Sequence, residues 1–122
     1  MVDKTEFEKK LYQQQEELEN EYLRRKKQYE QSQENIARIA YELNNIYAET
    51  TGVTRQVLGK LEAENSSFSK LEQINAGLSE SSQEVYRRQR KKLDLEWEEY
   101  QVAYRKKQDM LAEKFSKYRR DQ

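Results

Sequence analysis

Residues 93–118 read LDLEWEEYQVAYRKKQDMLAEKFSKY. In this stretch Trp97, Tyr104, Leu111 and Tyr118 recur every seven residues, and a second row begins with Leu93 and Tyr100. This is the a/d pattern of a coiled-coil helix, which carries one apolar stripe along its length. Such a helix, charged on its other faces, is not stable alone in water. The stretch therefore predicts a long helix that packs against a second helix.

The composition of the whole chain favours long helices. Its 122 residues are 34% hydrophobic and 38% charged, with no proline and only three glycines. This length suits one domain, and this balance suits a thin core shared between helices rather than a thick globular core. We expect residues 1–122 to form a single domain of the all-α class.

The residue types needed for common catalytic and metal sites are missing. The chain has no cysteine and no histidine, which removes thiol chemistry, disulfides and imidazole ligands. The carboxylate pairs, such as Glu16-Glu17 and Glu98-Glu99, lie beside lysine and arginine residues, as on a solvated helix surface. No glycine-rich phosphate loop is present. We expect no enzyme activity, no cofactor and no metal site.

Local signals place the expected elements along the chain. A capping box at Thr5–Glu8 starts a first helix to about residue 49, and the glycine at Gly52 suggests its end. An irregular tip is expected within 49–68, followed by a second helix to about residue 120. Serine-rich capping signals predict a kink or short break near 77–82. The heptad rows assigned to the interface between the helices are Leu11, Leu18, Ile39 and Ile46; Tyr22, Tyr29, Ile36 and Leu43; and Val57, Leu61, Phe68, Leu71, Leu78 and Val85.

The charge distribution favours an antiparallel arrangement of these helices. Residues 1–49 hold 8 basic and 11 acidic side chains, whereas residues 83–120 hold 12 basic and 7 acidic ones. Oppositely charged edges suit antiparallel neighbours, although each exposed pair contributes only about 0–1 kcal/mol. The prediction is a long antiparallel helical hairpin with coiled-coil-like packing.

Basic runs such as 24–27 and 87–92 raise the alternative of nucleic-acid binding, and a basic amphipathic helix raises that of an anionic membrane surface. The zero net charge and the interleaved acids oppose the first, and the narrow apolar stripe opposes the second. We therefore expect no nucleic-acid partner. No apolar run of about 18 residues exists, so we expect no membrane insertion. The amino terminus lacks signal-peptide features, which predicts a cytoplasmic protein, with co-secretion beside a cargo as the alternative.

The aromatic residues suggest where a partner binds. Nine tyrosines, three phenylalanines and one tryptophan stand at many positions that leucine usually fills in coiled coils. Tyrosine and tryptophan are enriched at interface centres, so these residues either pack within the hairpin or bind another helical protein. The alternative is a structural homodimer that buries the same residues against its own copy. The predicted partner-binding residues are Leu93, Trp97, Tyr100, Tyr104, Leu111, Phe115 and Tyr118.

The carboxy-terminal half resembles a known family. It runs from FSKLE at 68–72 through LSESSQE at 78–84 to RRQRKKL at 87–93, followed by charged heptads with Tyr100 and Tyr104. This sequence pattern resembles that of small all-helical proteins encoded beside LXG-domain toxins of bacteria that use type VIIb secretion systems. In helical architecture the resemblance covers about residues 5–118. In sequence pattern it covers the carboxy-terminal half.

The resemblance implies a role as a targeting or chaperone-like partner. Such proteins bind the helical amino-terminal region of an LXG toxin and help present it for export, together with a second small helical WXG-like partner. This sequence departs from the signal-bearing members of that system. The expected turn at Thr51-Gly52-Val53 has no tryptophan, and Trp97 falls in mid-helix. The expected role is therefore that of the accessory partner.

Overall fold

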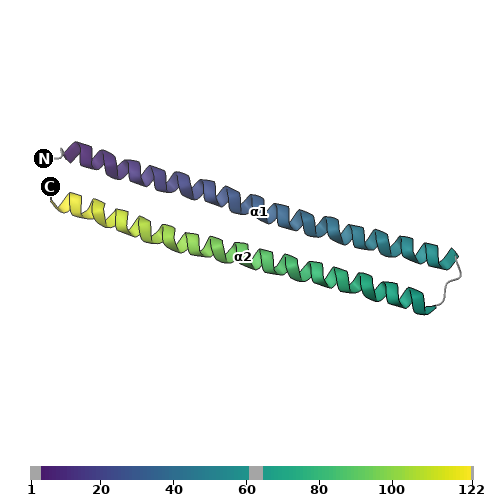
Figure 1. Ribbon diagram of the computed structural model, residues 1–122. Helices are drawn as coiled ribbons and strands as arrows, with labels where there is room; N and C mark the ends of the chain where they lie inside the picture. Colours follow the sequence, from purple (N-terminus) through teal and green to yellow (C-terminus); the bar gives the residue numbers. More distant parts are fainter. Residues whose placement is uncertain (1–3, 61–64, 122) are drawn as a thin grey trace. The chain divides into compact units, whose positions relative to one another are not determined.

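The computed structural model describes residues 4–60 and 65–121, and it contains two long helices (Figure 1). Helix α1 spans Lys4–Lys60 and helix α2 spans Asn65–Arg120. No strand occurs among the described residues. The absence of proline lets each helix extend without interruption, and Lys117, Arg119 and Arg120 in the last turn of α2 face the negative end of its dipole. The predicted all-α class is confirmed.

Contacts between the helices divide into two units. Unit 1 comprises residues 1–31 and 93–122, and unit 2 comprises residues 32–92. Within unit 1, Phe7 contacts Tyr118 and Tyr22 contacts Trp97, so higher numbers in α1 meet lower numbers in α2. Unit 2 shows the same order. In each unit, therefore, the two helices run antiparallel, as predicted. The single-domain organisation stays a prediction.

The predicted end of the first helix near residue 49 was wrong. Helix α1 continues through Gly52 to Lys60. A glycine costs a helix only about 1 kcal/mol, and no proline follows to stop it. Arg55, inside the window 49–68 within which an irregular tip was expected, donates through Nη2 to Glu72 Oε1 of α2 at 2.8 Å. The predicted turn window also includes residues 61–64, which lie outside the described residues.

The predicted short break near 77–82 was also wrong, because α2 continues through these residues. Its alternative, a kink there, stays a prediction. The serines read as capping residues have another role. Ser79 and Ser82 are half-buried, and the Ser82 hydroxyl lies 2.8 Å from the Tyr47 hydroxyl of α1. Small polar side chains at these positions therefore serve the packing of α2 against α1.

Complete burial is rare in this fold. Among the described residues, the buried apolar side chains are Leu11, which is 2% exposed, and Leu111, which is 8% exposed. Both belong to unit 1. Two helices alone bury only a narrow stripe each, so most other side chains at the interface remain partly accessible. The fold thus leaves a large share of its apolar side chains available at the surface.

Candidate helix-binding surface

Aromatic rings fill the space between the helices of unit 1. Tyr22 stacks on Tyr104 with ring centroids 4.4 Å apart, and Tyr29 stacks on Trp97 at 5.0 Å. Tyr12 meets Phe115 at 5.3 Å. Offset aromatic pairs of this kind contribute about 0.5–1.5 kcal/mol beyond their buried area. Unit 1 therefore derives its packing from ring contacts made within one chain.

Polar contacts reinforce the same cluster. The Tyr29 hydroxyl donates to Asp94 Oδ1 at 2.6 Å, a short bond to a carboxylate. The Arg25 guanidinium lies over the Tyr100 ring, 5.2 Å from its centroid. Its position over the ring makes Arg25 part of the packing between the helices.

All seven predicted partner-binding residues lie on α2 in unit 1. The structure places them against α1 rather than on an open surface, because each is buried or half-buried. Ring partners on α1 are present for Trp97, Tyr100, Tyr104, Phe115 and Tyr118. Their contacts are therefore those of the hairpin itself, and a role in binding a partner stays a prediction.

The environment of unit 1 also affects two tyrosines. Burial, followed by the nearby Glu21 carboxylate, raises the pKa of the Tyr100 hydroxyl above its ordinary value. The pKa of Tyr104 is raised by burial and then by Glu19. Both causes disfavour the tyrosinate anion, so both hydroxyls stay neutral and can donate hydrogen bonds at physiological pH.

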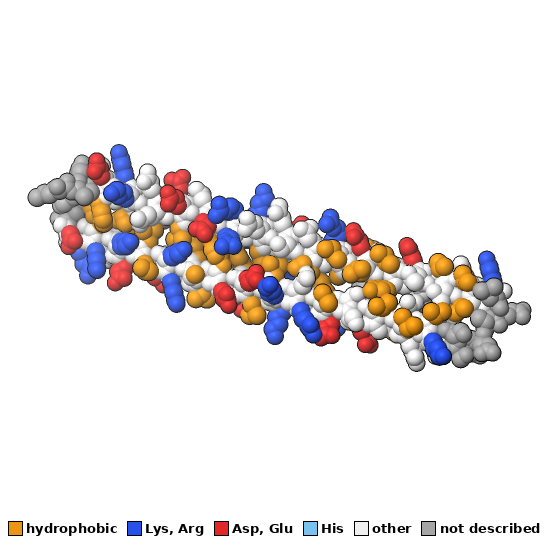
Figure 2. All heavy atoms as spheres, viewed as in Figure 1, with side chains coloured by type: hydrophobic (Ala, Val, Ile, Leu, Met, Phe, Trp, Pro, Cys, Tyr) orange, Lys and Arg blue, Asp and Glu red, His pale blue; other side chains and the backbone are white. Residues whose placement is uncertain are grey.

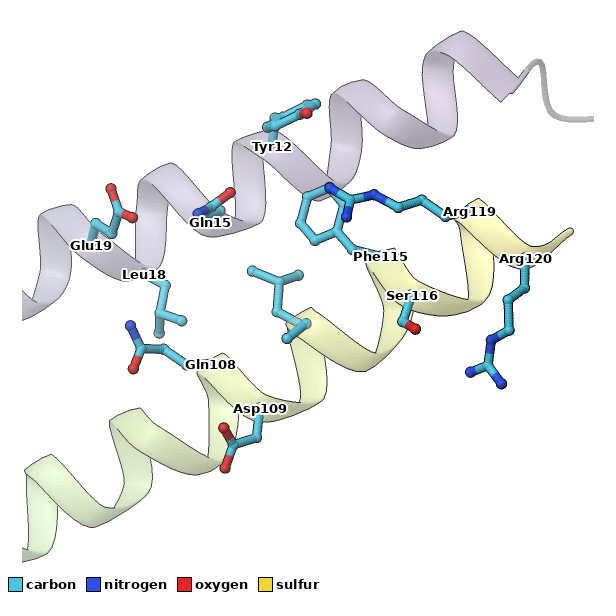
Figure 3. Close-up of a pocket in the computed structure, with 12 residues that line it drawn as sticks. Tyr12, Gln15, Leu18, Glu19, Gln108, Asp109, Phe115, Ser116, Arg119 and Arg120 are labelled. Carbon is cyan, nitrogen blue, oxygen red and sulfur yellow. The ribbon is translucent and has the colours of Figure 1, made fainter. Parts of the chain in front are cut away.

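A groove of about 670 Å³ opens between the helices of unit 1 near Leu18 and Phe115. Leu18 of α1 and Phe115 of α2 point into the space between the helices, whereas Asp109 and Arg120 point away from it (Figure 3). Its remaining walls include Gln15, Gln108 and Ser116, which give it a mixed polar and apolar lining. The groove therefore marks the gap left by glutamine at an interface position.

Unit 2 fills its interior differently. The half-buried positions of α2 that face α1 here include Glu72, Asn75, Ser79 and Ser82, all of them polar. The contacts between the helices of unit 2 include two polar ones, Tyr47 with Ser82 and Arg55 with Glu72. The Arg55–Glu72 pair is exposed and contributes about 0–1 kcal/mol. On α2, polar side chains thus occupy positions where unit 1 has aromatic rings, whereas α1 still contributes the half-buried Ile36, Leu43 and Leu58.

Eight other aliphatic side chains of unit 2 lie on one outer face. We call this the apolar face; its members are each between 37% and 59% exposed, namely Ile39, Ile46, Val53, Val57, Leu71, Ile74, Leu78 and Val85. Ile39 of α1 and Val85 of α2 line one groove of about 490 Å³. The other members follow at three-, four- or seven-residue steps, which keeps them on the same side of their helices. Figure 2 shows hydrophobic side chains gathered along both helices in the part of the view that holds unit 2.

The opposite side of unit 2 carries small residues instead of large aliphatic ones. Ala48 and Gly52 of α1 and Ala76 of α2 line a separate groove in unit 2. Ala48 lies two residues from Ile46, and Ala76 lies two residues from Leu78, and residues two apart do not share a helix face. Only one side of unit 2 therefore presents a continuous run of large aliphatic residues.

The heptad rows contained these residues but were assigned to the wrong place. The residues predicted at the interface between the helices but exposed in the structure are Ile39, Ile46, Val57, Leu71, Leu78 and Val85. A usable signal was present, since Val85 to Leu93 is eight residues where the repeat needs seven. That step shows that the apolar row of unit 2 is not continuous with the a/d row of unit 1. Of the same row, Leu61 and the side chain of Phe68 lie outside the described residues.

Other kinds of site find little support. Among residues 4–60 and 65–121, no group of three or more acidic side chains is arranged to hold a metal ion. Neither helix, over its described length, combines the length and apolarity needed to cross a membrane. Comparison with protein families, with characterised proteins and with solved structures found no match to this chain. The function must therefore be inferred from the side chains exposed at the surface.

Proposed function

We propose that this protein is a non-enzymatic helical adaptor that binds another long-helical protein. The observation that carries the proposal is the apolar face of unit 2, where eight large aliphatic side chains remain partly exposed in the hairpin. Contiguous apolar patches on soluble proteins rarely exceed a few hundred Å², and larger ones mark interaction sites. Their three-, four- and seven-residue spacing suits a partner that is itself an amphipathic helix.

The resemblance of the carboxy-terminal half supports a more specific partner. We propose that the adaptor binds the helical amino-terminal region of a secreted LXG toxin, with a second small WXG-like protein in the complex. In this role the chain acts like a chaperone in the cytoplasm and helps target its cargo to a type VIIb secretion system. The mechanism is burial of the apolar face, while the surrounding charges select the partner and its register.

A matched pair of variants tests the proposal. Val85 and Val102 are the same residue on the same helix, with 52% and 51% exposure, but only Val85 belongs to the apolar face. Co-expression with the toxin's amino-terminal region should give a stoichiometric complex with the unaltered chain. Val85→Asp should reduce co-purification at least tenfold, because it places a charge in a desolvated interface, whereas Val102→Asp should leave it within about twofold.

A variant at Trp97 in unit 1 tests whether the partner binds the aromatic residues of α2 instead. Circular dichroism of each variant checks that the helices still form. If Val85→Asp and Val102→Asp bind equally well while Trp97→Asp abolishes binding, the partner uses the aromatic residues of α2 and the apolar face is rejected as its site. If no complex forms with the unaltered chain, the proposed partner is rejected.

A further inference from the structure

We infer that unit 2 has a second packing arrangement, in which its two helices turn about their own axes and bury the apolar face between them. We call the arrangement in the structure the presented state and the second arrangement the turned state. The inference is based on a one-residue offset on both helices, the polar residues that α2 turns toward α1, and an extra residue in the apolar repeat. It goes beyond the adaptor proposal, and only its regulatory consequence rests on that proposal.

Each member of the apolar face lies one residue before a half-buried residue of the interface between the helices. The half-buried residues that follow the members on α1 are Ala40, Tyr47, Thr54 and Leu58. Those that follow the members on α2 are Glu72, Asn75, Ser79 and Tyr86. One residue corresponds to a turn of about 100° around a helix. A turn toward the preceding residue on each helix therefore brings all eight aliphatic side chains between the helices.

Neither arrangement satisfies the whole of unit 2. In the presented state α2 turns polar residues such as Asn75 and Ser79 toward α1, and the Tyr47 and Ser82 hydroxyls lie 2.8 Å apart. The turned state gives up that hydrogen bond and exposes Leu58, but it buries the eight aliphatic side chains. Hydrogen bonding favours the presented state, whereas aliphatic burial favours the turned state. Because these contributions oppose one another, one chain can populate both arrangements.

The apolar repeat contains the position at which the two arrangements diverge. Val85 to Leu93 is eight residues, where seven would continue the row. In the structure α2 passes through this step as one regular helix, so the half-buried Tyr86 and Arg90 lie seven and three residues before Leu93. A local change of winding that absorbs one residue would instead place Val85 and Leu78 in phase with Leu93. The step therefore lets α2 turn in unit 2 while its packing in unit 1 stays unchanged.

The two states regulate the adaptor, a consequence that rests on the proposed function. The turned state holds the aliphatic side chains between the helices, so a helical partner finds the apolar face only in the presented state. A ligand shifts an equilibrium by its difference in affinity for the two states. Partner binding should therefore convert the whole population to the presented state.

The experiment measures a distance that differs between the two states. Ala48 and Ala76 line one groove in the presented state, on the side opposite the apolar face, and the turn carries both away from that groove. The chain has no cysteine of its own, so the Ala48→Cys, Ala76→Cys double variant can carry two nitroxide labels. Pulsed electron resonance should give a short distance for the presented state and a longer one for the turned state. Their ratio should not change on tenfold dilution, because both states belong to a single chain.

Two neighbouring serines provide matched variants of the labelled chain. Ser82 is half-buried in the presented state, whereas Ser81 is exposed and falls in the row of Leu78 and Val85. Ser82→Leu should raise the ratio of short to long distances about three- to tenfold, because it adds an aliphatic side chain to the interior of the presented state. Ser81→Leu should lower the same ratio by a similar factor. Circular dichroism of each variant checks that the helices still form.

The outcomes separate this inference from the adaptor proposal. A single distance in the free chain, a ratio that follows protein concentration, or the same response to Ser81→Leu and Ser82→Leu overturns the inference. Addition of the toxin's amino-terminal region should leave only the short distance, and binding that leaves the ratio unchanged overturns the regulatory role. Two distances in a chain that binds no such region reject the adaptor proposal and leave the two states standing.

Discussion

Units 1 and 2 are built from the same two helices but place their apolar side chains differently. In unit 1, Tyr22, Tyr29 and Trp97 point between the helices and contact one another. In unit 2, α2 turns polar residues such as Ser79 and Ser82 toward α1, and eight aliphatic residues lie outside. The difference teaches that one helical hairpin can be satisfied internally over part of its length and incomplete over the rest.

The largest difference between the units should appear on removing a buried leucine. Leu11 in unit 1 is 2% exposed, so Leu11→Ala should lower the free energy of unfolding by about 3 kcal/mol. Leu78 in unit 2 is 51% exposed, and Leu78→Ala should cost less than about 1 kcal/mol at a concentration where the chain is monomeric. Urea unfolding measures both. Equal losses would mean that the units are packed alike.

The aromatic cluster of unit 1 offers the next largest effect. Trp97 contacts the rings of Tyr22, Tyr29 and Tyr100, so Trp97→Ala should cost about 2 kcal/mol. Tyr41→Ala in unit 2 is the control, because this tyrosine is 68% exposed. Thermal unfolding followed by circular dichroism compares the two. A Trp97→Ala chain as stable as the control would contradict the role given to the rings.

The glycines provide a way to strengthen unit 2. All three glycines lie in unit 2, and a methyl group added at Gly52 or Gly77 meets no other atom within 4 Å. Because alanine favours the helix over glycine, Gly52→Ala and Gly77→Ala should each stabilise the chain by about 0.5–1 kcal/mol. Urea unfolding should show the two gains adding. Destabilisation would mean that α1 or α2 leaves the helical conformation at that glycine.

The smallest effect concerns alkaline pH and unit 1. The pKa values of Tyr100 and Tyr104 are raised in the folded chain, whereas unfolded tyrosines ionise near pH 10. The unfolded state therefore loses these protons first, so stability should be unchanged below about pH 10 and should fall as pH rises through the folded pKa values. Urea unfolding from pH 8 to 11 should show a shallower fall for the Tyr100→Phe, Tyr104→Phe double variant. An identical slope would remove these two tyrosines from the alkaline transition.

The sequence predicted the helical class and the antiparallel pairing because these depend on composition, charge and heptad spacing. It misplaced the end of the first helix because the glycine at position 52 was given more weight than the continuing pattern around it. The serines near 77–82 resemble helix caps locally, and their true role depends on Tyr47, 35 residues away from Ser82. Local propensity does not contain such a long-range contact.

The candidate surface was harder to predict than the fold. Heptad spacing identifies residues that share a helix face, but it does not say whether that face meets the other helix of the hairpin or a different chain. Trp97 and Leu78 both occupy heptad positions, but in the structure Trp97 contacts α1 whereas Leu78 is exposed. Ile46 and Ala48, two positions apart, likewise acquire different roles only once Tyr47 is known to face α2.

Amide hydrogen exchange along the chain tests the central difference between the units most directly. The measurement compares the unaltered protein alone with the protein bound to the proposed helical partner. Amides of residues 5–31 and 93–120 should be protected in both samples, because unit 1 is packed within one chain. Amides of residues 32–60 and 69–92 should gain protection only in the bound sample. Equal protection of both units in the protein alone, or gains confined to unit 1, would contradict the account.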